Sequence, residues 1–433
     1  MLERIFKLSA NKTNVRTEII AGITTFMTMA YILAVNPGIL SEAGMDKGAV
    51  FTATVISSAL ATLVMAFYAR LPFALAPGMG LNAFFAYTVC IGMGHTWQFA
   101  LTAVFLEGLL FIALSFFNVR EMIVKSIPVN IKHAISVGIG LFIAFIGLKN
   151  AGVIVSDPAT FLKLTDITDI STNASPLIAL VGLVITGALL GLRVHGALLV
   201  GIIISTLIAI PFGITLLPTS FDFMPPSIAP VFAKFEWSQM FTLDMLVITV
   251  TFLFVDMFDT VGALIGVSSK ADMLDEQGNV PRAKEALMAD AIGTTAGAIL
   301  GTSTVTTYVE SAAGVAAGGR TGLTSAVTGV MFILALFLAP LFLMIPAAAT
   351  APALILVGAM MISPIKKIDF DDFTESIPVF LTIIMMPLCY SIAEGIVFGM
   401  LSYVLLKYLT GQHKQVSWVM SVLAVLFIIK FFI

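Results

Sequence analysis

Long apolar segments follow one another along almost the whole chain, and this feature constrains the fold more than any other. A helix needs about 20 mostly apolar residues to cross the hydrocarbon core of a membrane. Hydrophobic residues make up 59% of this sequence and charged residues only 11%, whereas about a quarter of a soluble domain is charged. The sequence therefore predicts an all-α membrane protein with about fourteen transmembrane segments. The expected spans are 17–36, 49–69, 72–93, 97–117, 131–150, 175–193, 194–216, 243–268, 285–302, 303–318, 321–344, 349–364, 374–391 and 392–410, followed by an apolar stretch at 417–433.

The positive charges orient these spans, because Lys and Arg concentrate on the cytoplasmic side of a membrane. When the N-terminus is placed in the cytoplasm, most of the 22 Lys and Arg residues fall on cytoplasmic segments, including Arg70, Arg193 and Arg320 in short turns. We therefore expect a multi-pass protein of the inner (plasma) membrane with a cytoplasmic N-terminus. The net charge of −3 gives no basic surface for nucleic acid.

The two halves of the chain resemble each other. Residues 195–206 are similar to 394–404, and residues 135–143 are similar to 354–362. Matching segments that lie seven spans apart cross in opposite directions, which is the inverted-repeat pattern of many secondary transporters. The predicted organisation is an N-terminal repeat at 1–216, a connecting segment at 217–242, a C-terminal repeat at 243–410 and an apolar tail at 411–433.

The third and tenth spans differ from ordinary transmembrane helices. Residues 73–87 read FALAPGMGLNAFFAY and residues 302–319 read TSTVTTYVESAAGVAAGG, so polar or Pro/Gly-interrupted pieces precede small residues. Backbone that is not helical at membrane depth must be buried in protein or line a cavity. We expect a short extended piece followed by a half-helix in each span, whose free N–H groups favour anionic or acceptor-rich ligands.

Acidic residues interrupt a few of the otherwise uncharged spans, namely Glu107, Asp256, Asp259, Asp290 and Glu310. A carboxylate inside a membrane costs a few kcal/mol and is a functional candidate by default. Asp256 and Asp259 are three residues apart and share one helix face. Glu310 lies where the extended piece should meet its half-helix. Glu107 and Asp290 are also explained by hydrogen bonds to neighbouring spans.

Asn82 has the position in the third span that Glu310 has in the tenth. Since no Lys or Arg lies nearby in sequence, the acids must be protonated, bonded to helix ends or paired with N–H groups of a substrate. Close carboxylates disfavour one another's ionised form, which suits coupling to protons.

Several classes of protein are poorly supported. The sequence has no GxxxxGK[ST] phosphate loop, no HExxH or GxSxG motif and no cluster with metal-ligand spacing. We therefore predict neither an enzyme nor a cofactor or metal site. A channel remains an alternative, although channels commonly show a repeated filter or a polar ring.

Four motifs resemble those of the AzgA-like purine permeases of the nucleobase–ascorbate transporter superfamily, and most closely the guanine/hypoxanthine permease type. They are TTFMTMAYILAVNP (24–37), APGMGLNAFFAY (76–87), FLFVDMFDTVGALIGV (252–267) and GTSTVTTYVESAAGVAAGGRTG (301–322). The resemblance implies a uracil-permease-like fold of two inverted seven-span repeats. It implies a core of spans 1–4 and 8–11 that moves like an elevator past a gate or scaffold of spans 5–7 and 12–14, in a homodimer.

The resemblance also implies a site for a purine. Its span-8 acid and span-10 glutamate, which hold the base, correspond to Asp256 and Glu310, and the second span-8 acid, Asp259, is tied to transport. The other expected substrate contacts are Asn82, Thr25, Thr28, Phe258 and Ser311.

The function expected from these features is uptake of purine nucleobases together with protons, with Asp256, Asp259 or Glu310 carrying the proton. The resemblance favours guanine and hypoxanthine over adenine, because adenine-selective members of the family tend to lack the span-3 asparagine and this sequence has Asn82. The alternatives are a pyrimidine or xanthine carrier of the same fold, and a channel or transporter for another small solute.

Overall fold

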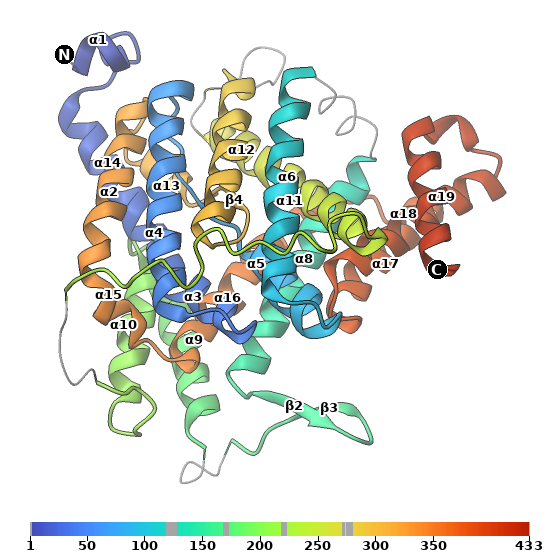
Figure 1. Ribbon diagram of the computed structural model, residues 1–433, viewed down its shortest axis with the longest axis horizontal. Helices are drawn as coiled ribbons and strands as arrows, with labels where there is room; N and C mark the ends of the chain where they lie inside the picture. Colours follow the sequence, from blue (N-terminus) through green and yellow to red (C-terminus); the bar gives the residue numbers. More distant parts are fainter. Residues whose placement is uncertain are drawn as a thin grey trace. The chain divides into compact units, whose positions relative to one another are not determined.

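The computed structural model describes residues 2–117, 128–167, 173–217, 223–270, 273 and 280–432 (Figure 1). Its elements, in chain order, are α1 (Leu2–Phe6), α2 (Val15–Met29), α3 (Ile32–Glu42), α4 (Lys47–Val64), η1 (Met65–Ala69), β1 (Leu75–Pro77), α5 (Met79–Ala83), η2 (Phe84–Gly92), α6 (Trp97–Phe117), α8 (Val129–Asn150), β2 (Ile154–Asp157), β3 (Phe161–Leu164), α9 (Ser175–Gly191), α10 (Ala197–Ala209), α11 (Leu243–Lys270), α12 (Ala283–Leu300), β4 (Val305–Thr307), α13 (Ser311–Ala316), α14 (Gly322–Ala335), η3 (Leu336–Leu338), α15 (Ala339–Leu343), α16 (Ala347–Met361), η4 (Ser363–Lys367), α17 (Phe373–Leu388), α18 (Ile392–Leu409), η5 (His413–Gln415) and α19 (Trp418–Phe432).

Helices long and apolar enough to cross a membrane recur along the chain. Among the described residues, eight helical runs are long and apolar enough: Val15–Glu42, Lys47–Ala69, Trp97–Ser115, Val129–Asn150, Leu243–Ser268, Gly322–Leu343, Ala347–Lys367 and Ile392–Leu409. Shorter apolar helices occur at Met79–Gly92, Ser175–Gly191, Ala197–Ala209 and Phe373–Leu388. The prediction of a helical, multi-pass membrane protein is confirmed, while the count of fourteen crossings stays a prediction.

The chain divides into two compact units. One consists of Met1–Ala113 with Gly147–Ala353, and the other of Leu114–Ile146 with Leu354–Ile433. Each unit is assembled from segments far apart in sequence. The expected division into a moving core and a gate concerns motion and stays a prediction.

Two short strands are buried in the first unit. Strands β1 and β4 pair antiparallel, with Ala76 opposite Thr306, and all of their residues are buried. A short helix follows each strand, α5 after β1 and α13 after β4. Pro77 cannot donate a backbone hydrogen bond, and β-branched Val305, Thr306 and Thr307 favour extended backbone. The expected extended piece and half-helix in both spans are thus confirmed.

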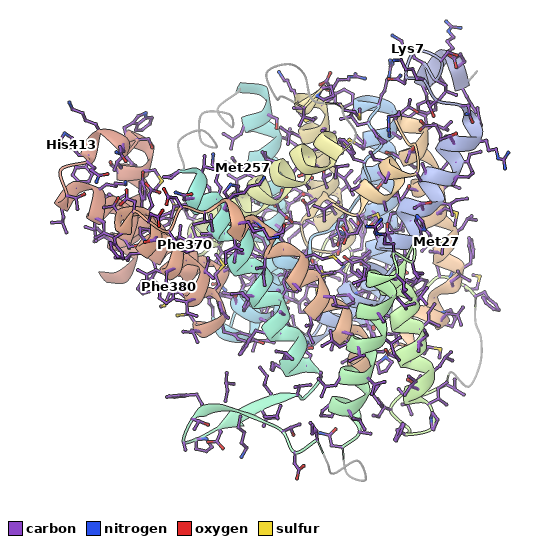
Figure 2. The ribbon with its side chains drawn as sticks, turned by 180° about the vertical axis from the view of Figure 1, so that it is seen from behind. Lys7, Met27, Met257, Phe370, Phe380 and His413 are labelled. Atoms are coloured by element: carbon purple, nitrogen blue, oxygen red, sulfur yellow. The ribbon has the colours of Figure 1, made fainter. Side chains whose placement is uncertain are left out.

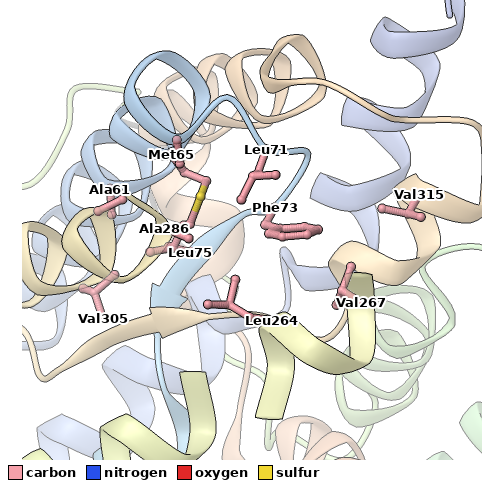
Figure 3. Close-up of a cluster of buried hydrophobic side chains, with 12 residues drawn as sticks. Ala61, Met65, Leu71, Phe73, Leu75, Leu264, Val267, Ala286, Val305 and Val315 are labelled. Carbon is pink, nitrogen blue, oxygen red and sulfur yellow. The ribbon is translucent and has the colours of Figure 1, made fainter. Parts of the chain in front are cut away.

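An apolar cluster packs around this strand pair (Figure 3). It joins the end of α4, the approach to β1, the C-terminal half of α11, the start of α12, β4 and α13; its labelled members include Met65, Phe73, Leu75, Leu264 and Val305. The close approach depends on Gly293, where an added Cβ would lie 2.6 Å from Cβ of Ala61 and 3.2 Å from a Val305 methyl. Within the same unit, α14 packs against α2 and α4 (Figure 1).

The second unit is held by close packing and by the buried Lys407, which lies near two acids, with its Nζ 3.8 Å from Oδ2 of the more exposed Asp372. Helix α18 meets α17 at Gly399, where an added Cβ would lie 1.8 Å from Oγ1 of Thr382. Nζ of Lys407 is 2.9 Å from Oε1 of Glu375, and the Lys407 side chain is almost fully buried. Other apolar side chains of this unit are exposed. Phe380 on α17 is 59% exposed, as expected of a helix that faces lipid (Figure 2).

A β-hairpin lies between α8 and α9, in a segment for which the sequence predicts no transmembrane span. Strands β2 and β3 pair antiparallel from Ile154 opposite Leu164 to Asp157 opposite Phe161. The turn is closed by Asp157, whose Oδ1 accepts hydrogen bonds from the backbone N–H groups of Ala159 and Thr160. An Asx turn is formed by hydrogen bonds between residues a few positions apart, so this turn can form without contacts to the rest of the protein.

Candidate functional site

The first span is broken where it reaches the site. The sequence suggested one helix over 17–36, whereas α2 ends at Met29 and α3 begins at Ile32. Tyr31 lies at the break and is almost fully buried. Its hydroxyl donates a 2.6 Å hydrogen bond to Oε1 of Glu310, so the break in span 1 meets the start of the half-helix in span 10.

Glu310 immediately precedes α13 and is half-buried. The hydroxyl of Thr28 on α2 lies 3.4 Å from the Glu310 carbonyl oxygen, but its shorter hydrogen bond, 2.8 Å, goes to the carbonyl of Thr25. Thr28 therefore lies beside Glu310 and stabilises its own helix. Of the two threonines expected at the site, Thr25 has the freer hydroxyl.

Asp256 and Asp259 extend from α11 toward different neighbours. Asp256 is fully buried, and Oγ1 of Thr260 lies 3.3 Å from its Oδ1. Asp259 is half-buried, and its Oδ2 lies 3.6 Å from the point that a Cβ on Gly78 would occupy. The carboxyl of Asp259 is close enough to those of Asp256 and Glu310 for their charges to interact. The structure thus brings the three predicted acids together.

Thr260 is the junction of a buried network. Its hydroxyl lies 3.1 Å from both carboxyl oxygens of Asp290 on α12 and 2.8 Å from Oγ1 of Thr306 on β4. Since a hydroxyl has only one hydrogen to donate, it can satisfy one of these acceptors at a time. Asp290, for which the sequence left two readings open, is therefore linked to Asp256 through one side chain.

Asn82 on α5 is fully buried and accepts a hydrogen bond from the Ser303 hydroxyl. Its Nδ2 has no hydrogen-bond partner among the described residues, and the same holds for Oγ1 of buried Thr25. A buried polar group without a partner costs about 1–3 kcal/mol. Each of these two atoms is therefore a place where a ligand could compensate a local deficit.

Each residue of the polar segment 302–306, which leads into β4, makes a hydrogen bond to another element. The hydroxyls or backbone of 302–306 bond to five different elements, through the pairs Thr302–Asn36, Ser303–Asn82, Thr304–Glu107, Val305–Thr294 and Thr306–Thr260. Buried polar groups need such partners. This explains why a segment too polar for a lipid-facing helix occurs within an apolar chain.

The remaining expected substrate contacts are Ser311 and Phe258. The Ser311 hydroxyl accepts a 3.0 Å hydrogen bond from the backbone N–H of Ala74, so it ties the start of α13 to the approach of β1. The side chain of Phe258 lies outside the described residues. Within the described ranges, no group of three or more His, Cys, Asp and Glu side chains could hold a metal ion.

Sequence reasoning missed Tyr31, Thr260 and Tyr308. The Tyr308 hydroxyl donates to the carbonyl oxygen of Pro77 at 2.5 Å, which links β4 to β1. Each of these is a hydroxyl-bearing residue within an apolar span. That pattern could have marked them as candidates, but only packing shows which acid or carbonyl each one reaches.

A helical membrane protein in which two strand-and-half-helix units pair beside buried acids has the architecture of a permease. A model described as "Permease family" matches residues 16–398. The chain belongs to this family, the nucleobase–ascorbate transporter family.

Similar proteins have been given permease names. A putative permease of Methanocaldococcus jannaschii is 53% identical, with 99% of this chain and 98% of that protein covered. An adenine permease of Escherichia coli is 44% identical (99% and 96% covered). A guanine/hypoxanthine permease of Bacillus subtilis is 43% identical (99% of each).

Among solved structures, the transmembrane domain of a cyanobacterial bicarbonate transporter superposes with a TM-score of 0.66 at 15% identity, covering 89% of this chain and 97% of that one. At this identity the likeness shows the fold alone. The shared fold is the uracil-permease-like fold expected from the sequence.

Proposed function

We propose that this chain is a secondary active transporter that imports purine nucleobases together with protons, favouring guanine and hypoxanthine and admitting adenine. One observation carries the proposal: Asp256, Asp259 and Glu310 lie close together in a chain whose buried Asn82 has an unpartnered amide donor. A purine presents N–H donors to carboxylates and acceptors to an amide N–H. Charge-assisted hydrogen bonds in a dry site supply both affinity and selectivity.

The choice among purines depends on single groups in the site. The adenine and guanine/hypoxanthine permeases are equally similar to this chain, at 44% and 43% identity, so similarity does not separate the substrates. The Asn82 amide favours an oxopurine, because its N–H can donate to the carbonyl oxygen of the purine. Adenine has no carbonyl oxygen and offers only ring nitrogens as acceptors.

The proposed mechanism is an elevator-type alternation in which a protonated carboxylate accompanies the base inward. We place the protein in the plasma membrane as a homodimer with a cytoplasmic N-terminus. Spans 1–4 and 8–11 form the moving core, and spans 5–7 and 12–14 form the gate. The strand pair that joins the third and tenth spans supports this core, because both half-helices would have to move together.

The test is uptake of radiolabelled hypoxanthine into cells that lack their own purine carriers, with unlabelled guanine, adenine, xanthine and uracil as competitors. We expect competition by guanine, weaker competition by adenine and loss of accumulation with a protonophore. Asp256→Asn and Glu310→Gln should each lower uptake at least about tenfold. Glu285→Gln serves as the control, because Glu285 lies at the start of α12, is partly exposed and pairs with Arg282. Displacement only by xanthine or uracil, or uptake that a protonophore leaves unchanged, would contradict the proposal.

A further inference from the structure

Glu107 is a buried carboxyl that the proposed mechanism has not used. It lies on α6, a helix that is apolar around it, and it is fully buried. The next residue, Gly108, fixes the helix against α12, because an added Cβ there would lie 2.5 Å from Oγ1 of Thr295. The position of Glu107 is therefore set by close backbone packing.

The carboxyl of Glu107 has two kinds of neighbour. Oγ1 of Thr304 donates to its Oε2 at 3.2 Å. Its Oε1 has no hydrogen-bond partner among the described residues, and its carboxyl lies close enough to that of Asp256 for a proton to bridge the two. The titratable groups that face it are Asp256 on α11 and Asp290 on α12. Since Asp256 is itself fully buried, two carboxyls from different helices meet away from solvent.

Two carboxylates in contact in a buried place cannot both be ionised without a large cost. A single proton between them removes one charge and creates a short, strong O–H···O hydrogen bond. The acceptor left on Asp256 can still receive an N–H donor. The Thr304 hydroxyl gives Glu107 a further donor, so that Glu107 can keep its place when it loses the proton.

We propose that Glu107 and Asp256 share one proton, that this proton accompanies the substrate, and that Glu107 is a positioning residue that orients Asp256 toward the base. The inference rests on the proposed function and names the coupling site within it. The proton is then held by a pair of acids from α6 and α11, rather than by Asp256, Asp259 or Glu310 alone.

The experiment uses the purified full-length protein in liposomes and two assays, hypoxanthine exchange without a gradient and accumulation driven by a pH gradient. In Glu107→Gln the amide still donates to Asp256 but carries no exchangeable proton at that position. We expect exchange within about threefold of the unchanged protein, accumulation at least about tenfold lower, and an exchange KM that no longer varies between about pH 5 and pH 8. Glu107→Leu removes the donor as well and should weaken exchange about tenfold or more.

Accumulation and a pH profile like those of the unchanged protein in Glu107→Gln would overturn the proposal, as would equal exchange by Glu107→Leu and Glu107→Gln. Glu285→Gln is the control for the same chemical change at a partly exposed site that pairs with Arg282. A second measurement does not depend on transport: the infrared carbonyl band of protonated carboxyl groups at neutral pH should decrease in both Glu107→Gln and Asp256→Asn. An unchanged infrared band in either variant would disprove the shared proton. If the unchanged protein exchanged no purine at all, the proposed function would be disproved instead.

Discussion

Tyr31 and Glu310 are 279 residues apart in sequence, and the Tyr31 hydroxyl donates a 2.6 Å hydrogen bond to the Glu310 carboxyl. The bond joins the break between α2 and α3 to the start of α13. It leaves the other Glu310 oxygen to receive a substrate N–H. Tyr31 thereby orients the acid that is expected to hold the base.

Tyr31→Phe removes this hydrogen bond without changing the shape of the ring. Since hydrogen bonds to charged groups contribute about 1.5–3 kcal/mol, we expect the KM for hypoxanthine to rise about tenfold or more. Tyr68→Phe, on a side chain that is 50% exposed, is the control. An unchanged KM in Tyr31→Phe would show that Glu310 does not need this donor for binding.

Glu18 is a buried acid whose role is structural. Its carboxylate accepts five hydrogen bonds at the start of α14, from the backbone N–H groups of Arg320, Thr321 and Thr324 and from the hydroxyls of both threonines. Glu18→Gln replaces an acceptor oxygen by an N–H₂ that faces donors. We expect a loss of roughly 2–4 kcal/mol in the free energy of unfolding, measured as a lower melting temperature in detergent. Glu285→Gln removes only a surface ion pair with Arg282 and should lower the melting temperature far less, because such pairs contribute about 0–1 kcal/mol. Equal melting of Glu18→Gln and the unchanged protein would show that the network rearranges.

Gly314 lets α13 lie against α2. A Cβ at this position would be 2.0 Å from Oγ1 of Thr25 and 2.7 Å from the carbonyl oxygen of Ala21. Gly314→Ala should displace α13 and with it Glu310, at a cost of about 1–3 kcal/mol, and uptake should be lost in protein that still reaches the membrane. Gly187→Ala is the matched control, because nothing lies within 4 Å of its added Cβ. Normal uptake by Gly314→Ala would mean that α13 can shift without harm.

The buried ion pair of the second unit gives a prediction about stability. Lys407→Met leaves the Glu375 carboxylate without its cation, and breaking a buried pair costs roughly 3–5 kcal/mol. Adding Glu375→Gln removes the uncompensated charge, so the double variant should melt higher than Lys407→Met. Thermal unfolding of the unchanged protein, Lys407→Met and the double variant is the measurement. If Lys407 only fills space, adding Glu375→Gln would lower the melting temperature further instead of raising it.

Glu236 lies in the segment that connects the two halves of the chain. Hydrogen bonds from Thr96, Gln239 and Ser238 hold the pKa of its carboxyl below the ordinary value of 4.5. A lowered folded-state pKa gives stability that is present above the unfolded value and is lost as the pH falls through the folded one. Glu236→Gln should therefore melt lower than the unchanged protein at neutral pH, and the difference should shrink below about pH 4.5. A difference that stays constant with pH would show that the charge contributes nothing.

Much of the fold could be predicted because it depends on local composition. Apolar length marks the helices that could span a membrane, and the β-branched polar run from Thr302 to Thr307 marks the strand within the tenth span. The acids of α11 stood out because charge is rare in such spans. Their roles as substrate contacts, and those of Asn82, Thr25, Thr28 and Ser311, stay predictions.

The sequence by itself determined the membrane class, the extended pieces of the third and tenth spans and the candidate acids, since each follows from residues within one segment. Only the tertiary structure decided that Tyr31 reaches Glu310, that Thr260 joins Asp256 to Asp290, that Glu107 meets Asp256 and that Glu18 holds the start of α14. These contacts connect side chains from different elements. Helix packing alone brings such groups within hydrogen-bonding distance, and no local pattern of residues specifies which partner each will find.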